Sequence, residues 1–342
     1  MAYTDIDKPS DYFDTKLYTG NAGTLNVTGL DFQPDWVWIK NRTSDYTHGL
    51  YDSVRGAGSS KGIYSNTNEA EGTNSAFQNL TSFNSDGFSL GSTSNTNVIN
   101  TNSQNHVSWN WKAGTSFTND ASATGIGSID STGSVNTDAG FSIVSYSGNS
   151  TAGATIAHGL GATPKMMIVR KRNSAENWLV YHASTGNTGA TLLNGTNAFF
   201  QDDMWNSTSP TSSVFTVHGG AGANASGGTY IAYCFTDVKG YSKFSSYIGN
   251  GNADGAFVYT GFKSAFVMIK KTSGTGNWCL FDNKRGVNGA MIQLNPDVNN
   301  ADNTSNYIDF LSNGFKCRNT ASDKNASGGS YIYMAFAENP FV

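Results

Sequence analysis

Apolar residues in this chain occur in short runs that are separated by turn-forming residues. In residues 267–281, an apolar run leads into a Gly- and Ser-rich stretch, and a second apolar run follows directly. This succession is typical of a strand, a loop and a second strand. No window of about eleven residues keeps apolar residues at positions i, i+3, i+4 and i+7, and strong helix formers nowhere cluster. The pattern therefore predicts an all-β protein of antiparallel strands.

The same landmarks recur along the chain at a spacing of about 100 residues. Residues 224–231 (NASGGTYI) return as residues 325–332 (NASGGSYI), and residues 36–40 match both 166–170 and 266–270. Self-similarity at a fixed period indicates units of one fold that follow one another along the chain. The sequence predicts three tandem antiparallel β-sandwich repeats of about 100 residues each.

The repeats divide the chain into four parts. In order, these are a first repeat with a short N-terminal arm (1–113), a linker rich in Gly, Ser and Thr (114–139), a second repeat (140–238) and a third repeat (239–342). Because only residues 236–240 join the last two repeats, we expect these two to be rigidly related and the first to be more independent. The same alignment predicts that Trp111, Phe235 and Phe336 are equivalent core residues on the last strand of each repeat.

Charge and hydropathy exclude two classes of partner. Charged residues make up 13% of the chain, against roughly 25% in an average soluble domain, and the formal net charge is −4. Nucleic-acid-binding proteins usually carry a clustered basic surface, whereas the longest basic run here is residues 170–172. No stretch approaches the roughly 18 apolar residues of a membrane span, and the first residues lack the features of a signal peptide. We therefore expect no nucleic-acid partner and no membrane insertion.

The sequence contains no motif of a common catalytic or metal site. It lacks the nucleophile elbow, the phosphate-binding loop and the His-Glu-x-x-His pattern, and its three cysteines lack metal-ligand spacing. Histidines interchange with other residue types between repeats, since His106 stands where the other repeats have Tyr230 and Tyr331. The acidic pair Asp202 and Asp203, of the type that glycoside hydrolysis needs, does not recur. We expect no enzymatic activity, no cofactor and no bound metal.

One charged pattern does recur, an aspartate three residues before an Arg-Gly pair. It occurs as Asp52 with Arg55 and again as Asp282 with Arg285. This spacing favours a turn that is closed by its own ion pair. The alternative is a polar grip that points outward to a ligand, beside nearby aromatic side chains. On that alternative, the candidate ligand-binding residues are Asp52, Arg55, Trp178, Trp278, Asp282 and Arg285.

Four segments of the chain carry a family resemblance. They are residues 9–21 (PSDYFDTKLYTGN), 109–117 (WNWKAGTSF), 133–143 (GSVNTDAGFSI) and 157–161 (AHGLG). Together they resemble a domain family of unknown function, the tandem-repeat virion structural proteins of tailed phages that infect marine bacteria. The resemblance extends over nearly the whole chain. It implies a virion structural protein whose domains are similar to lectin-type or jelly-roll sandwiches.

Two functional hypotheses follow from this resemblance. The first is a surface decoration or appendage component of the phage head or tail, which binds other virion proteins and its own copies. Its place would be the virion, after assembly in the host cytoplasm. The second is a tail-fibre-type receptor-binding adhesin that recognises host surface glycans. A fibre usually has a stalk with a heptad or β-helix period, and the absence of either period from the sequence favours the first hypothesis.

Overall fold

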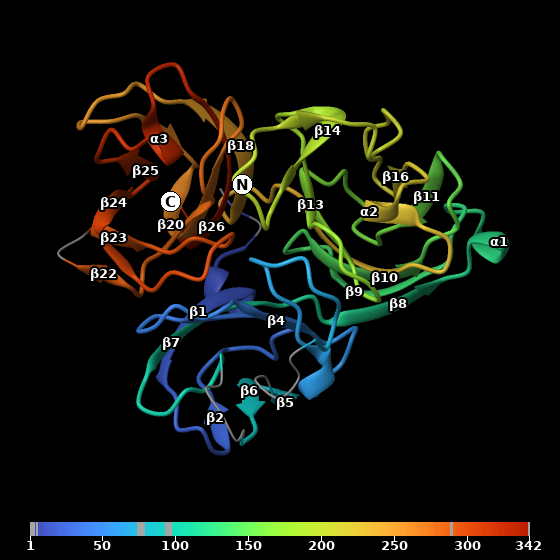
Figure 1. Ribbon diagram of the computed structural model, residues 1–342, viewed down its shortest axis with the longest axis horizontal. Coiled ribbons are helices and arrows are strands. Elements are labelled where there is room, and N and C mark those ends of the chain that lie inside the picture. The colour runs from blue at the N-terminus through green and yellow to red at the C-terminus, as the bar shows by residue number, and fades with distance from the viewer. Residues whose placement is uncertain (1–3, 5, 74–78, 93–97, 288–289, 341–342) are drawn as a thin grey trace.

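The structure is a computed structural model that describes residues 4, 6–73, 79–92, 98–287 and 290–340 (Figure 1). The described residues form a mostly-β protein with several antiparallel sheets and very little helix. The helical segments are the 3₁₀ turns η1 (Pro9–Asp11) and η2 (Ser59–Lys61) and the four-residue helices α1 (Ala121–Thr124), α2 (Ala221–Asn224) and α3 (Ser322–Asn325). The predicted fold class is therefore confirmed at the level of a mostly-β chain.

The first region, residues 4–113, contains two sheets. One has the strand order β1-β7-β3-β4 and consists of β1 (Phe13–Thr19), β3 (Trp36–Asn41), β4 (Gly49–Asp52) and β7 (Asn105–Trp111). The other has the order β2-β6-β5 and consists of β2 (Leu25–Val27), β5 (Leu80–Asn84) and β6 (Gly87–Leu90).

The middle region, residues 114–236, contains an eight-stranded sheet and a strand pair. The sheet has the order β15-β14-β13-β12-β17-β10-β9-β8. Its strands are β8 (Thr115–Asn119), β9 (Ser131–Asn136), β10 (Phe141–Ser147), β12 (Met166–Lys171), β13 (Leu179–His182), β14 (Gly186–Leu192), β15 (Phe200–Gln201) and β17 (Thr229–Phe235). The separate pair consists of β11 (Ala154–Ala157) and β16 (Val214–Val217).

The third region, residues 237–340, again contains two sheets. One has the order β18-β26-β20-β21 and consists of β18 (Ser242–Ile248), β20 (Phe262–Lys271), β21 (Cys279–Asp282) and β26 (Ser330–Pro340). The other has the order β19-β25-β24-β23-β22 and consists of β19 (Phe257–Tyr259), β22 (Gly286–Val287), β23 (Ala290–Gln293), β24 (Asn303–Leu311) and β25 (Gly314–Cys317).

One strand order occurs in all three regions. The orders β1-β7-β3-β4, β10-β17-β12-β13 and β18-β26-β20-β21 each pair an early strand with the last strand of the region. The register places Trp111, Phe235 and Phe336 at the same point of these last strands, because they pair in order with Trp36, Met166 and Phe266. All three are almost completely buried. Their predicted equivalence as core residues is therefore confirmed.

Residues 114–139 differ from the expected linker. They contain β8, α1 and β9, and β9 pairs along its whole length with β10. Glycine serves close packing here, since a Cβ on Gly133 would lie 2.2 Å from the backbone oxygen of Ile143 and 2.6 Å from the ring of Phe117. A segment rich in Gly, Ser and Thr thus extends the sheet, because its Thr and Val residues suit a pleated surface.

The largest hydrophobic core contains side chains from all three regions. The ring of Trp36 lies 4.4 Å between centroids from Trp111 of its own region and 4.4 Å from Tyr233 of the middle region. Phe13 stacks on Phe336 of the third region at 5.2 Å. The first region is therefore packed as closely as the others, although the sequence predicted it to be more independent. Large aromatic contacts of this kind contribute strongly to stability and do not depend on linker length.

Candidate functional site

The recurring acid and arginine form buried ion pairs. Arg55 Nε donates to Asp52 Oδ2 at 2.5 Å, and Arg285 Nε donates to Asp282 Oδ2 at 2.6 Å, with all four side chains inaccessible to solvent. Buried ion pairs need further hydrogen bonds to be favourable, and Arg55 Nη2 also donates to the Leu50 backbone oxygen at 3.1 Å. The arrangement is the turn closed by its own ion pair, and the outward grip is not present.

Each of these aspartates also binds a neighbouring region. The Tyr233 hydroxyl of the middle region donates to Asp52 Oδ2 at 2.7 Å, and Trp109 Nε1 of the first region donates to Asp282 Oδ2 at 2.9 Å. The ion pairs therefore connect regions of the protein. Because they face the interior, they offer no surface to an external ligand.

Trp178 and Trp278, the two tryptophans predicted to bind a ligand, also connect regions of the protein. Trp178 Nε1 donates to the Tyr64 backbone oxygen of the first region at 2.8 Å, and Trp278 Nε1 donates to the Leu192 backbone oxygen of the middle region at 2.8 Å. Both indoles are buried. All six predicted site residues thus lie at contacts between regions.

Three buried cations, which sequence reasoning missed, complete these contacts. Lys40, Arg170 and Lys270 occupy matching positions on β3, β12 and β20, and each donates to a backbone oxygen of another region. The acceptors are, in order, Asn299 at 3.0 Å, Glu69, and Gly195 at 3.0 Å. Burial lowers the pKa of Lys40 to about 7. Lys40 thus joins the first region to the third, Arg170 joins the middle region to the first, and Lys270 joins the third region to the middle. The set of contacts is therefore cyclic.

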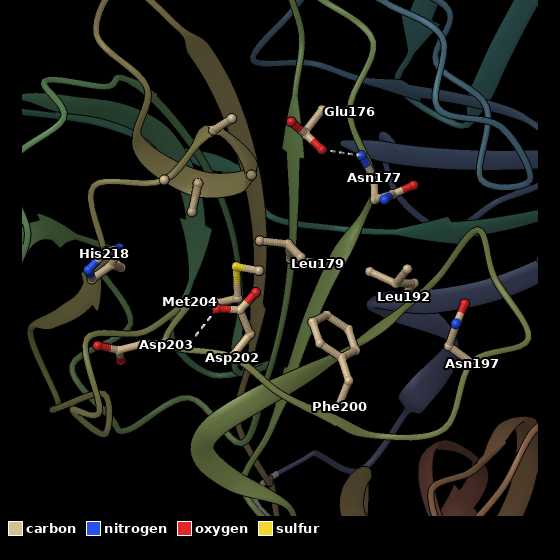
Figure 2. A pocket seen from close by; sticks show the side chains of 14 residues that line it. Glu176, Asn177, Leu179, Leu192, Asn197, Phe200, Asp202, Asp203, Met204 and His218 are labelled. Atoms are coloured by element: carbon tan, nitrogen blue, oxygen red, sulfur yellow. Dashed lines mark hydrogen bonds between the residues drawn. The ribbon is translucent and has the colours of Figure 1, made fainter.

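A cavity of about 540 Å³ opens on the middle region (Figure 2). Its apolar lining comes from β13, β14, β15 and α2 and consists mainly of Leu179, Leu192, Phe200, Met204 and Ala223. Its polar lining consists of Glu176, Asn177, Asn197, Asp202, Asp203 and His218. The lining holds three carboxylic acids and no Lys or Arg, so its charge is negative.

The carboxylates of the cavity accept their described hydrogen bonds from residues close by in the sequence. Glu176 Oε1 accepts from the Asn177 backbone at 3.0 Å, and Asp202 Oδ1 accepts from the Asp203 backbone at 2.8 Å. Asp203 Oδ1 accepts from the Ser207 hydroxyl at 3.2 Å. Among the residues that the structure describes, none of the three acids has a cationic partner within ion-pair distance. Each therefore keeps oxygen lone pairs for an external donor.

Position 223 is one point at which the region that holds the cavity differs from the other two. In each region one tyrosine hydroxyl donates to the backbone oxygen of the matching residue. These bonds are Tyr146 to Ala223 at 2.8 Å, Tyr247 to Lys324 at 2.6 Å and Tyr18 to Ile99 at 2.6 Å. The next residue is in every case an asparagine whose side-chain oxygen accepts a backbone N–H. Ala223, Lys324 and Ile99 are therefore equivalent.

The long side chains at this position are buried in the other two regions. Lys324 is inaccessible to solvent, and its Nζ donates to Gln293 Oε1 at 3.0 Å. Ile99 is likewise inaccessible and belongs to a core of the first region. The methyl group of Ala223 leaves the corresponding space empty. An alignment of the repeats at the NASGG segments shows this difference in size, which is the sequence signal that could have located the cavity.

The described part of the chain lacks two further features. No cluster of His, Cys, Asp and Glu is placed to hold a metal ion there. The described helices include none with the length and apolar character needed to cross a membrane.

One protein family matches the chain, over residues 8–340, and its description is a domain of unknown function, DUF7483. The chain belongs to the DUF7483 family. Since the match spans all three regions, the DUF7483 domain corresponds to the whole body around the shared core and not to one repeat. No curated protein and no solved structure matched this DUF7483 chain. The family description assigns no activity.

Proposed function

We propose that this DUF7483 chain is a structural protein that acts by binding and assembly, as a surface decoration or appendage component of a phage virion. The observation that carries the proposal is the single aromatic core shared by three regions. A protein of this construction is a rigid body that presents loops and sheet faces to partners. The virion as its location is supported by the resemblance of the sequence to virion proteins of tailed phages.

The proposal includes three tandem β-sandwich units that form a closed ring. Support comes from the strand order common to the three regions and from the equivalent hydrogen bonds at Ala223, Lys324 and Ile99. The cyclic contacts of Lys40, Arg170 and Lys270 join each unit to the next. Closure buries the inner face of every unit, so the outer faces are free for other virion proteins and for further copies of the chain.

The proposal does not include covalent chemistry or a cofactor. The two acids that sequence reasoning considered for glycoside hydrolysis, Asp202 and Asp203, are both exposed at the cavity rim. The general acid of that reaction typically lies in a hydrophobic enclosure. Exposure to water provides no such enclosure, and this supports binding over catalysis.

A second candidate function is a receptor-binding adhesin for host surface glycans. The specific observation that favours it is the cavity of the middle region, with its apolar base and its polar rim. Pockets of this construction are typical of small-ligand sites.

Purified particles of a phage that encodes this chain test the proposal. Quantitative mass spectrometry should find the protein in many copies per particle, and particles assembled without it should lose head or tail integrity or host attachment. Finding the protein free in the lysate and absent from purified particles would overturn the virion assignment.

A further inference from the structure

We propose that the cavity of the middle region binds one sugar unit that carries no negative charge, either a neutral or an amino sugar. This inference rests on the second candidate function, the recognition of surface glycans, and names its site and its class of ligand.

The size and the base of the cavity fit a sugar ring. Its volume of about 540 Å³ lies within the roughly 300–1,000 Å³ of small-molecule sites. Leu192, Phe200 and Met204 are only partly buried and pack against the core below them. In Figure 2 the Phe200 ring and Leu192 lie between Asp202 and Asn197. A pyranose has an apolar C–H face, and these side chains provide an apolar surface for it.

The rim of the cavity fits the hydroxyl groups of a sugar. Glu176 and Asp202 keep free oxygen lone pairs, because each accepts only a backbone N–H among the described contacts. The Asn197 side chain adds an amide that both donates and accepts. Hydrogen bonds from hydroxyl or ammonium groups to carboxylates are charge-assisted and therefore strong. The rim thus favours a ligand that is rich in donors.

The charge of the rim selects against acidic sugars. Three carboxylates and no Lys or Arg line the cavity, so a uronic acid, a sialic acid or a phosphorylated sugar would meet like charges. Juxtaposition of like charges is a common way to exclude a wrong partner. A neutral sugar meets no repulsion, and an amino sugar is attracted.

Position 324 of the third region, which is equivalent to position 223, indicates which substitution would fill the cavity. There the side chain of Lys324 occupies the interior and donates to Gln293. In the first region Ile99 is buried at this position. Ala223→Ile therefore reproduces inside the middle region a filling that the fold already accepts, and it leaves the acids of the rim unchanged.

The test measures binding to the full chain by isothermal titration. The probes are maltose, cellobiose, chitobiose and glucosamine as non-anionic sugars, galacturonate and glucose 6-phosphate as anionic sugars, and a lysine-containing peptide. The variants are Ala223→Ile and Asp202→Asn, and Asp86→Asn is the control because it removes an exposed acid outside the cavity. Thermal unfolding of each variant verifies that it is folded, and the exposed position of Asp202 keeps that variant informative even if Ala223→Ile does not fold.

We expect at least one non-anionic sugar to bind, with affinity reduced at least about tenfold in Ala223→Ile and in Asp202→Asn and unchanged in Asp86→Asn. If a sugar binds equally well to the folded cavity variants, the site is wrong while glycan recognition stands. If no non-anionic sugar binds, the inference and the second candidate function both fail, and virion assembly is judged by the particle experiment alone. Preference for an anionic sugar, or binding of the lysine peptide only, would also overturn the inference.

Discussion

The middle and third regions share the order of four strands but have different residues at one equivalent position. At one equivalent position the middle region has Ala223 beneath an open cavity, and the third region has the buried side chain of Lys324. The tyrosine and asparagine hydrogen bonds around the position are the same in both regions. The order of four strands and these hydrogen bonds are therefore kept, while the side chain at this position differs. The second sheet differs as well, since β24 pairs with β25 in the third region, whereas in the middle region β15 pairs with β14 and β16 pairs with β11. Regions that share the order of four strands can therefore differ in whether an equivalent position borders a cavity.

The comparison also concerns charge. The third region buries the Lys324 amino group, and its Nζ donates to the Gln293 amide oxygen, which provides the hydrogen bond that a buried polar group needs. The middle region instead exposes acids around an empty space. The Lys324 side chain thus fills a core in the third region, whereas the acids of the middle region keep hydrogen-bonding capacity for a partner.

Acidification should have the largest effect, and the histidines that cause it lie in the first and middle regions. Burial lowers the pKa of His106, His158 and His182 to about 4, below the roughly 6.5 of an exposed histidine. Between these pH values the unfolded chain binds protons that the folded chain does not, so stability falls as the pH drops. We expect urea denaturation to show a loss of roughly 5 kcal/mol between pH 7 and pH 5. Equal or greater stability at pH 5 would mean that these histidines are not held neutral.

Truncation of the shared core comes next. Phe235→Ala in the middle region and Phe336→Ala in the third should each cost about 3–5 kcal/mol, as buried aromatics generally do. Because both rings belong to one core, each variant should unfold in a single cooperative transition. Phe257→Ala is the control, since that ring is 47% exposed and should change the unfolding free energy little. Separate transitions for the regions would contradict a common core.

A reciprocal pair of substitutions tests the comparison itself. Lys324→Ala should destabilise by about 2–4 kcal/mol, because it opens a cavity and leaves the Gln293 amide without its donor. Ala223→Ile should change the unfolding free energy by less than about 1 kcal/mol, since it fills a space that is open to solvent. Both values come from equilibrium urea denaturation at pH 7. Equal effects at the two positions would show that the regions do not differ as described.

The last predicted loss of stability concerns one contact between regions. Tyr233→Phe removes the hydroxyl that donates to Asp52, and it keeps the ring that stacks on Trp36. We expect a loss of about 1.5–3 kcal/mol, the range for a hydrogen bond to a charged group. An unchanged midpoint in urea would indicate that the link from the middle region to the first contributes nothing.

Features that depend on local pattern could be predicted from the sequence. The equivalence of Trp111, Phe235 and Phe336 follows from the spacing of apolar strands, and the structure has them in the same register. Residues 114–139 were misassigned because a Gly-, Ser- and Thr-rich composition suits both a linker and a strand. Only pairing with β10 decides between the two.

Features that depend on contacts between regions could not be predicted. Trp178 and Trp278 were candidate ligand residues as aromatic side chains beside the recurring Asp–Arg pattern, yet their indoles donate to backbone oxygens of other regions. Burial of this kind is a property of the assembled fold. The cavity was missed for a similar reason, since Ala223 becomes informative only when it is compared with Lys324 and Ile99.

Thiol accessibility in the native protein tests the central difference most directly. The chain's own thiols, Cys234, Cys279 and Cys317, are buried, and burial raises their pKa values to about 11 or 12, so the unaltered chain should react very slowly with a maleimide. The account predicts that Ala223→Cys, beside the open cavity, reacts at least about tenfold faster than Ile99→Cys, enclosed in the first region's core. Equal rates in the two folded variants would contradict the claim that only the middle region is open at this position.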